Sequence, residues 1–308
     1  MFYLVKEGLE QIPPEQVDGS RLTAGYVDVE TLGKLYEQFG FAPSTVESCR
    51  SVNAYFRSGV EVYEDYIFTE LRIAGGEQPD DCVALYLQKN GMLLVDIDDK
   101  DGSTRGKFET ALRRCAAGQA TTEKLLCCFI EALVADAPRY IETTRNEISR
   151  IEERILDEHT DKSLNRTLLS LKRDLLQMHN YYDQLLDITE TVEEDEYDLF
   201  TEKGLIAVSN LSEKLRRLRE DIDALGSGVD HLQDAYTSAL DLELNNTMKF
   251  FTVLSMVFFP LTIIVGWYGM NFVHMPEFAW KYGYVYVIVL SILVVAALTV
   301  YAKRKRWL

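Results

Sequence analysis

Two long uncharged segments constrain the folding of this 308-residue chain more than any other feature. Residues 250–268 form a run of 19 residues without a charged side chain, and residues 282–302 form a second run of 21. A helix needs about 20 apolar residues to cross the hydrocarbon core of a bilayer. We therefore expect two transmembrane helices in a lipid bilayer, preceded by a much larger soluble part.

The distribution of charge predicts the orientation. From Met248 onward there are six basic side chains and one acid, a net +5, and because the whole chain carries −17, residues 1–247 carry −22. Residues 303–306 are all basic and follow the second run, and such clusters stay on the cytoplasmic side. Two spans return the chain to its starting side. We expect a multi-pass protein of the cell (inner) membrane with both termini in the cytoplasm.

The acidity of the soluble part also restricts its partners. A surface at −22 repels phosphate backbones and attracts cations, which argues against nucleic acid as a partner. The five cysteines have no CxxC spacing and read as reduced thiols. The chain has no Gly-rich phosphate loop, no HExxH sequence and no recognisable Ser/His/Asp arrangement, so we do not expect an enzyme.

Residues 1–118 are expected to form a cytoplasmic α/β domain. Four segments are rich in β-branched and aromatic residues: 1–5, 60–73, 83–88 and 92–97. Asn90-Gly91 predicts a hairpin turn between the last two, and Asp28 is a candidate helix cap. Residues 96–102 resemble a calcium loop, but Lys100 occupies its fifth position, so a solvated turn is expected.

Residues 119–203 are expected to form antiparallel cytoplasmic helices, with an acidic bend at 190–198. A second stretch, 204–269, predicts a stalk helix that continues into the first span, on the order of 100 Å long. One helix of the first stretch and the stalk helix each carry a coiled-coil-like seam of apolar residues. The first seam is Leu164, Leu168, Leu171, Leu175, Met178, Tyr182 and Leu185; the stalk seam is Val208, Leu211, Leu215, Leu218, Ile222, Leu225, Val229, Leu232, Tyr236 and Ala239. Because such a helix cannot bury its seam alone, we expect further copies of the chain.

The first span carries a stripe of small and polar side chains. Its members are spaced alternately four and three residues apart: Ser255, Thr262, Gly266 and Gly269, with Phe259 between them, and Asn245 and Met248 on the same stripe before the span. Such a stripe fits two structures equally, either close packing of helices or several spans around a pore. Pro260 adds a kink that is tolerated where neighbours or water satisfy the freed carbonyl group.

The segment after this span resembles a known family. Gly269-Met270-Asn271 closes the first span, Met275-Pro276-Glu277 follows, and a last span then leads into a basic tail. This combination resembles the CorA magnesium channel family, closely over residues 204–308. The resemblance implies a homopentameric funnel, an α+β membrane protein in which the first span lines the pore. Residues 270–281 would then form the external loop, residues 282–302 the second span and residues 303–308 the cytoplasmic tail.

The resemblance also implies a role for individual residues. Asn271 would form the outer ring of amide oxygens that selects hydrated Mg2+, with Gly269 and Met270 holding its loop. Glu277 would concentrate cations at the mouth. The pore lining that it implies is Asn245, Met248, Phe251, Ser255, Phe259, Thr262 and Gly266. Neutral amides suit a cation that gives up its water reluctantly.

One part of the family pattern is altered in this chain. The family places a pair of acids between cytoplasmic domains, where internal Mg2+ regulates the channel. Here Glu47 matches, whereas Ser48 and Asn210 stand where acids are expected, and Asp136 is a candidate for a second regulatory site.

We therefore expect a transporter of Mg2+, with Co2+ and Ni2+ as further candidates, that uses the electrochemical gradient. Channel-like flux and proton-coupled transport both fit the sequence. One alternative is a zinc transporter of the same superfamily, which would have Val at the position of Met270. A second alternative is a non-conducting membrane scaffold.

Overall fold

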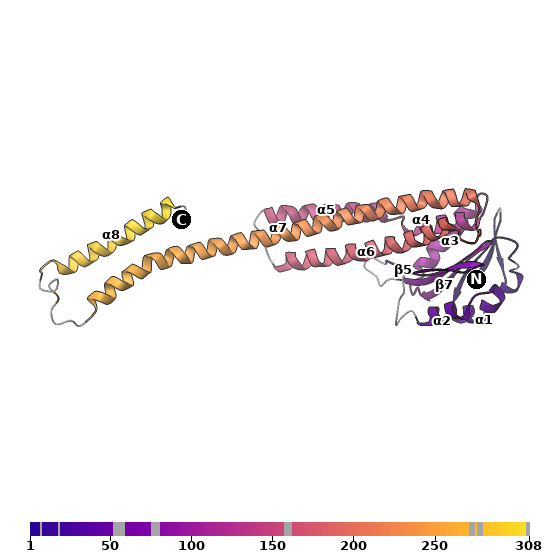
Figure 1. Cartoon of the computed structure of the whole chain (residues 1–308), viewed down its shortest axis with the longest axis horizontal. Helices are drawn as coiled ribbons and strands as arrows, with labels where there is room; N and C mark the ends of the chain where they lie inside the picture. Colours follow the sequence, from indigo (N-terminus) through magenta and orange to yellow (C-terminus); the bar gives the residue numbers. More distant parts are fainter. Residues whose placement is uncertain are drawn as a thin grey trace. The chain divides into compact units, whose positions relative to one another are not determined.

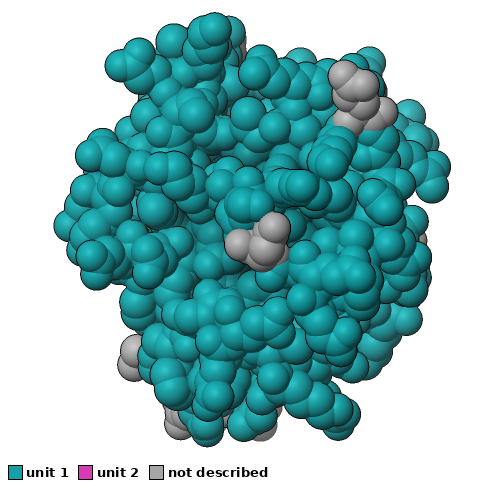
Figure 2. Space-filling view, turned by 90° about the vertical axis from the view of Figure 1, so that its right-hand side faces the viewer, with its two compact units in different colours: residues 1–153, 161–232 teal, residues 154–160, 233–308 magenta. Residues whose placement is uncertain are grey.

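The computed structural model describes residues 1–6, 8–17, 19–51, 59–74, 81–156, 162–270, 275 and 280–305. The chain divides into two units. Unit 1 comprises residues 1–153 and 161–232, and unit 2 comprises residues 154–160 and 233–308. Figure 2 shows one face of unit 1 in space-filling form.

A seven-stranded mixed sheet organises the first part of unit 1. Its strands are β1 (Phe2–Val5), β2 (Leu9–Ile12), β3 (Thr23–Asp28), β4 (Val60–Val62), β5 (Tyr66–Ile73), β6 (Asp81–Gln88) and β7 (Gly91–Asp98). Their order is β2-β1-β3-β7-β6-β5-β4, and β3 pairs with β7 in parallel. Residues 82–87 of β6 are buried throughout, because helices cover both faces of this central strand.

Helices cover the two faces of the sheet (Figure 1). On one face lie α1 (Val29–Phe39) and α2 (Pro43–Ser51), and on the other lie α3 (Ser103–Ala116) and α4 (Thr122–Leu133); a short 3-10 helix, η1, spans Pro14–Gln16. The predicted cap of α1 is confirmed, because the backbone N–H of Thr31 donates to Asp28 Oδ1 over 2.8 Å. The aromatic rings of Phe41 and Tyr86 stack with their centroids 4.2 Å apart. Phe41 lies just before α2 and Tyr86 belongs to β6, so this contact packs the α2 side of the hydrophobic core against the sheet.

The hairpin between β6 and β7 differs by one residue from the prediction. Gly91 already pairs with Gln88, so the loop consists of Lys89 and Asn90. Contacts from elsewhere in the fold explain the shift: the Lys89 carbonyl accepts from Thr122 Oγ1 over 3.0 Å, and the Asn90 carbonyl accepts from the backbone N–H of Thr23 over 3.1 Å.

Three helices follow: α5 (Ala137–Leu156), α6 (Lys162–Glu194) and α7 (Glu202–Tyr268). Ion pairs show that α6 and the start of α7 run antiparallel, since Lys172 pairs with Asp230 and Arg216 pairs with Glu190. At the predicted acidic bend, Asp195 has a φ of 39° and its carboxylate accepts from two backbone N–H groups that follow it. The predicted seam of α6 is buried, apart from the half-buried Met178.

The stalk seam requires a correction. Residues Val208, Leu215 and Val229 are 0% exposed within a single copy of the chain, and burial continues to Tyr236. Helices α5 and α6 of the same chain provide the cover; a Cβ added at Gly228 would lie 3.9 Å from Ile148 of α5. The inference that this seam needs other copies was therefore wrong. After the isolated Ile206 near its start, the exposed large apolar residues of α7 begin at Leu242.

Unit 2 contains the second part of α7 and α8 (Gly283–Arg304). Both helices are long and apolar enough to cross a membrane, with mean hydropathies of 2.1 and 2.6 over their most apolar windows. Only 6% of each window is buried within the chain, unlike the core helix of a soluble protein. The end of α7, residues 250–268, is the first uncharged run of the sequence, and α8 covers nearly all of the second.

Candidate ion pathway

The candidate pore residues form one uncovered stripe on α7. Their spacing places Asn245, Met248, Phe251, Ser255, Phe259, Thr262 and Gly266 within roughly a third of the helix circumference. All seven are exposed, with Met248 at 68% and Phe259 at 69%, as are most residues of this part of α7, so the polar members and not the exposure distinguish the stripe. A membrane-spanning helix with polar groups on such a stripe needs a neighbour or water against it.

The hydroxyl group of Thr262 is arranged as an acceptor. It donates its proton to the carbonyl oxygen of Phe258, four residues earlier, over 2.9 Å. A hydroxyl oxygen keeps two lone pairs after donating. The exposed Thr262 oxygen can therefore accept hydrogen bonds from the water shell of a passing cation.

Pro260 lies inside α7, which continues through it without a break. A proline has no backbone N–H, so the carbonyl group of Met256 loses its helical donor. This frees one backbone oxygen in the first span. Within the hydrocarbon region such an oxygen is stable where it faces water or a neighbouring polar group.

Helix α7 ends at the predicted filter. The backbone N–H of Gly269 donates to the Val265 carbonyl over 2.9 Å, and that of Met270 donates to the Trp267 carbonyl over 3.4 Å. A Cβ at position 269 would lie 2.9 Å from the same Val265 oxygen, so glycine fits this tight end. Met270 is exposed. Asn271 and Glu277 lie outside the described residues.

The candidate regulatory residues are dispersed over unit 1. Glu47 is exposed on α2, Asp136 is exposed between α4 and α5, and Asn210 is exposed on α7. Ser48 is half-buried. Among the described residues, neither Glu47 nor Asp136 belongs to a group of three or more His, Cys, Asp or Glu side chains whose ligand atoms lie within 4.8 Å of one another.

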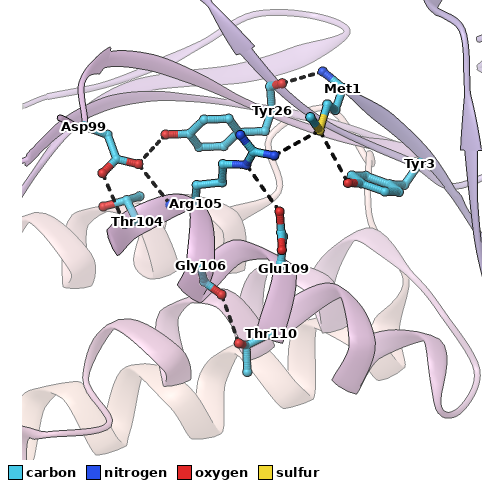
Figure 3. A network of polar contacts seen from close by, with 9 residues as sticks. All are labelled: Met1, Tyr3, Tyr26, Asp99, Thr104, Arg105, Gly106, Glu109 and Thr110. Atoms are coloured by element: carbon cyan, nitrogen blue, oxygen red, sulfur yellow. Dashed lines mark hydrogen bonds and ion pairs between the residues drawn. The ribbon is translucent and has the colours of Figure 1, made fainter. Parts of the chain in front are cut away.

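A carboxylate cluster that we did not predict from the sequence lies at the start of α3. Oxygen atoms of Asp81, Asp99 and Asp101 come within 4.8 Å of one another. Residues 100–102 are exposed, as the expected solvated turn requires, but Asp99 is only 9% exposed and departs from that expectation. Its carboxylate accepts from the hydroxyl of Tyr26 over 2.6 Å and from the backbone N–H of Arg105 over 3.0 Å (Figure 3).

These carboxylates hold the first turn of α3. Asp81 accepts from the hydroxyls of Ser103 and Thr104 over 2.7 and 2.8 Å, and Asp101 accepts from the backbone N–H of Ser103 over 2.8 Å. Carboxylates near a helix N-terminus satisfy its free N–H groups and favour its dipole. Burial, and then the hydrogen bond to Asp99, raise the pKa of Tyr26, which therefore stays a donor. The signal in the sequence was the acidic run directly before Ser103-Thr104.

Comparisons with known proteins agree over almost the whole chain. The family described as "CorA-like Mg2+ transporter protein" matches residues 24–304. The Cobalt/magnesium transport protein CorA of Thermotoga maritima is 28% identical over 286 residues, which cover 91% of this chain and 80% of that protein.

Two solved structures show the same fold at lower identity. The CorA magnesium transporter from Methanocaldococcus jannaschii matches with a TM-score of 0.81 and 17% identity, over 100% of this chain and 98% of that one. The ZntB cytoplasmic domain from Vibrio parahaemolyticus matches with a TM-score of 0.59 and 13% identity, over 78% of this chain and 97% of that one. The predicted order is confirmed: an N-terminal α/β domain, a long helix and two C-terminal candidate spans.

Proposed function

The chain belongs to the CorA-like Mg2+ transporter family, whose members are divalent-cation transporters and not enzymes, and from this premise we propose that it carries hydrated Mg2+ into the cytoplasm. Five copies would surround one pore. In this proposal the first span lines the pathway, and the membrane potential drives the ion inward. The potential contributes about 2.3 kcal/mol per charge per 100 mV, so roughly twice that for a divalent ion.

The uncovered stripe of α7 is the observation that carries this proposal. Polar members such as Asn245, Ser255 and Thr262 alternate along it with Met248 and Phe259. Such a stripe suits a pathway in which oxygen atoms hydrogen-bond the ion's water shell and apolar rings close it by excluding water. Lipid contact would leave the accepting lone pairs of the Ser255 and Thr262 hydroxyl oxygens without donors.

Selection of the ion is assigned to the mouth of the pathway. We propose that the Asn271 amides, one from each copy, accept hydrogen bonds from the water shell of Mg2+, while Glu277 raises the local cation concentration. A neutral ring binds a hydrated divalent ion without stripping it, which favours rapid release. Co2+ and Ni2+ have similar hydrated ions and are expected to compete.

Topology and regulation follow from charge. The basic residues 303–306, which follow the second uncharged run, support a cytoplasmic C-terminus. Two spans then place the α/β domain in the cytoplasm as well. Internal Mg2+ bound between subunits would relieve repulsion between acids. Because Ser48 and Asn210 replace the expected acidic pair, we propose that Glu47 and Asp136 carry what remains of this regulation.

Transport of Zn2+ is the second candidate function. The likeness of the soluble part to the ZntB cytoplasmic domain favours it, although at 13% identity this likeness shows only a shared fold. Met270 in place of Val favours Mg2+.

Uptake into proteoliposomes tests the proposal. The purified protein should take up Mg2+ faster than Zn2+, and Asn271→Ala should reduce Mg2+ uptake by more than about tenfold, since it removes the selecting oxygens. Asn246→Ala is the matched control, because Asn246 is an exposed amide that lies off the stripe. Measurement with and without a pH gradient separates channel-like from proton-coupled flux. Unchanged uptake in Asn271→Ala, or faster uptake of Zn2+, would contradict the proposal.

A further inference from the structure

A cavity of about 940 Å³ lies in unit 1 between α6, α7 and the end of β5. Three arginines from three different elements line it: Arg72 of β5, Arg173 of α6 and Arg219 of α7. The side chains of Asn180 and Gln184 also line it. The ion pathway does not use this cavity.

The charge of the cavity is opposite to that of its surroundings. Three guanidinium groups line it against two carboxylates, Asp183 and Asp187, within a soluble part that carries −22. Asp183 is already engaged, because Arg219 Nη1 donates to it over 3.0 Å and His179 Nε2 lies 3.0 Å from its other oxygen. Beside this pair the lining has Arg72 and Arg173 against Asp187, whose pKa is raised by burial and by the carboxylates of Asp183 and Glu190. The lining thus keeps a small positive formal charge within acidic surroundings.

Two buried polar groups on the cavity wall have no acceptor. Among the residues that the structure describes, neither the Tyr181 hydroxyl nor Arg219 Nε has a hydrogen-bond partner. Tyr181 is only 4% exposed, and its burial raises the pKa of the phenol far above its ordinary value, so the group keeps its proton. Buried donors without acceptors are uncommon and costly. Both atoms have almost no accessible surface, so a bound anion would reach them only after a small shift of the side chains of the cavity wall.

We propose that this cavity binds a phosphate-bearing anion, with Arg72, Arg173 and Arg219 as its ligands. Guanidinium groups bind phosphate oxygens through paired, charge-assisted hydrogen bonds. Cavities of this volume accommodate ligands from inorganic phosphate to a nucleotide. A bound anion would connect the sheet to both helices and so link the cytoplasmic domain to the start of α7. The proposal is independent of which cation the chain carries.

Calorimetric titration of the full-length protein in detergent tests the proposal. Inorganic pyrophosphate is the probe, and EDTA removes divalent ions that it would otherwise chelate. We expect binding below about 1 mM, and at least about tenfold weaker binding for Arg173→Gln. Arg173 is exposed, so its replacement should leave the fold intact. Arg166→Gln is the matched control, since Arg166 is an exposed arginine of α6 that does not line the cavity.

A second variant separates ligand binding from structure. Tyr181→Phe removes only the hydroxyl, so the free protein should melt at the same temperature or higher, while the pyrophosphate-induced increase in melting temperature becomes smaller. No binding at about 10 mM, or equal weakening by Arg166→Gln and Arg173→Gln, would overturn the proposal. So would a Tyr181→Phe protein that melts earlier but keeps the full pyrophosphate response.

Two further probes distinguish the sources of phosphate. Inorganic phosphate and adenosine diphosphate are titrated under the same conditions. Tighter binding of adenosine diphosphate than of pyrophosphate would indicate that the nucleoside contacts the apolar wall near Leu176. Equal binding would assign the affinity to the phosphates alone, and both results support the proposal.

Discussion

A single buried carboxylate organises the start of α7. Glu123 of α4 is 3% exposed, and its Oε1 accepts from both the backbone N–H and the hydroxyl of Thr201, over 2.6 and 2.9 Å. Thr201 Oγ1 in turn accepts from the N–H of Gly204 over 3.2 Å. A side chain at position 204 would overlap the Glu123 carboxyl, which explains the glycine. The sequence offered no signal for this contact, because its partners lie 78 residues apart.

We expect replacement of the Glu123 carboxylate to lower the stability of the protein in a pH-dependent way. Burial alone would raise the pKa of Glu123, but hydrogen bonds from Thr121 and Thr201 lower it below its ordinary value of 4.5. Its stabilising contribution is therefore present above pH 4.5 and is lost as the pH falls through the lowered pKa. Glu123→Gln should cost about 1.5–3 kcal/mol at neutral pH. Thermal unfolding of both proteins at several pH values measures this, and a difference that grows on acidification would contradict it.

At the scale of elements, periodic patterns predicted more than local turn signals did. Leucines at alternating spacings of four and three located the buried face of α6, because amphipathic spacing in a long helix depends on few tertiary contacts. The β6–β7 turn shifted by one residue because distant groups bind its carbonyls. The stalk seam was located correctly, but its partner was not. Periodicity indicates that a face is buried, and only the fold shows that α5 and α6 bury it.

Substitutions along α7 should test whether α5 and α6 of the same chain bury the stalk seam. Leu215 is fully buried within one chain, so Leu215→Ala should lower the free energy of unfolding by about 2–5 kcal/mol. Ile206 lies on the same helix and is 64% exposed, so Ile206→Ala should change it by less than about 0.5 kcal/mol. Denaturant unfolding of the detergent-solubilised protein measures both values. Equal losses would mean that the seam is not buried by its own chain.

At the scale of the molecule, the sequence predicted the class of protein because its strongest signals, two uncharged runs and a charge contrast, depend little on detail. The filter is different, since Asn271 and Glu277 were assigned by resemblance and stay predictions. The assembly also stays a proposal, and the part of α7 that supports it is not the part expected from the sequence. Residues 208–236 no longer argue for further copies, whereas the uncovered stripe from Asn245 to Gly266 does.

The last prediction concerns this assembly. A pore lined by one stripe per copy requires several copies, and the proposed number is five, so native mass measurement in detergent should give about five times 35.3 kDa. Five soluble parts at −22 would bring about −110 charges around one axis, partly screened over a Debye length of about 8 Å. Assembly should therefore be stronger at moderate salt than at low salt when EDTA is present. A stable monomer or dimer under both conditions would leave the stripe without a pore to line.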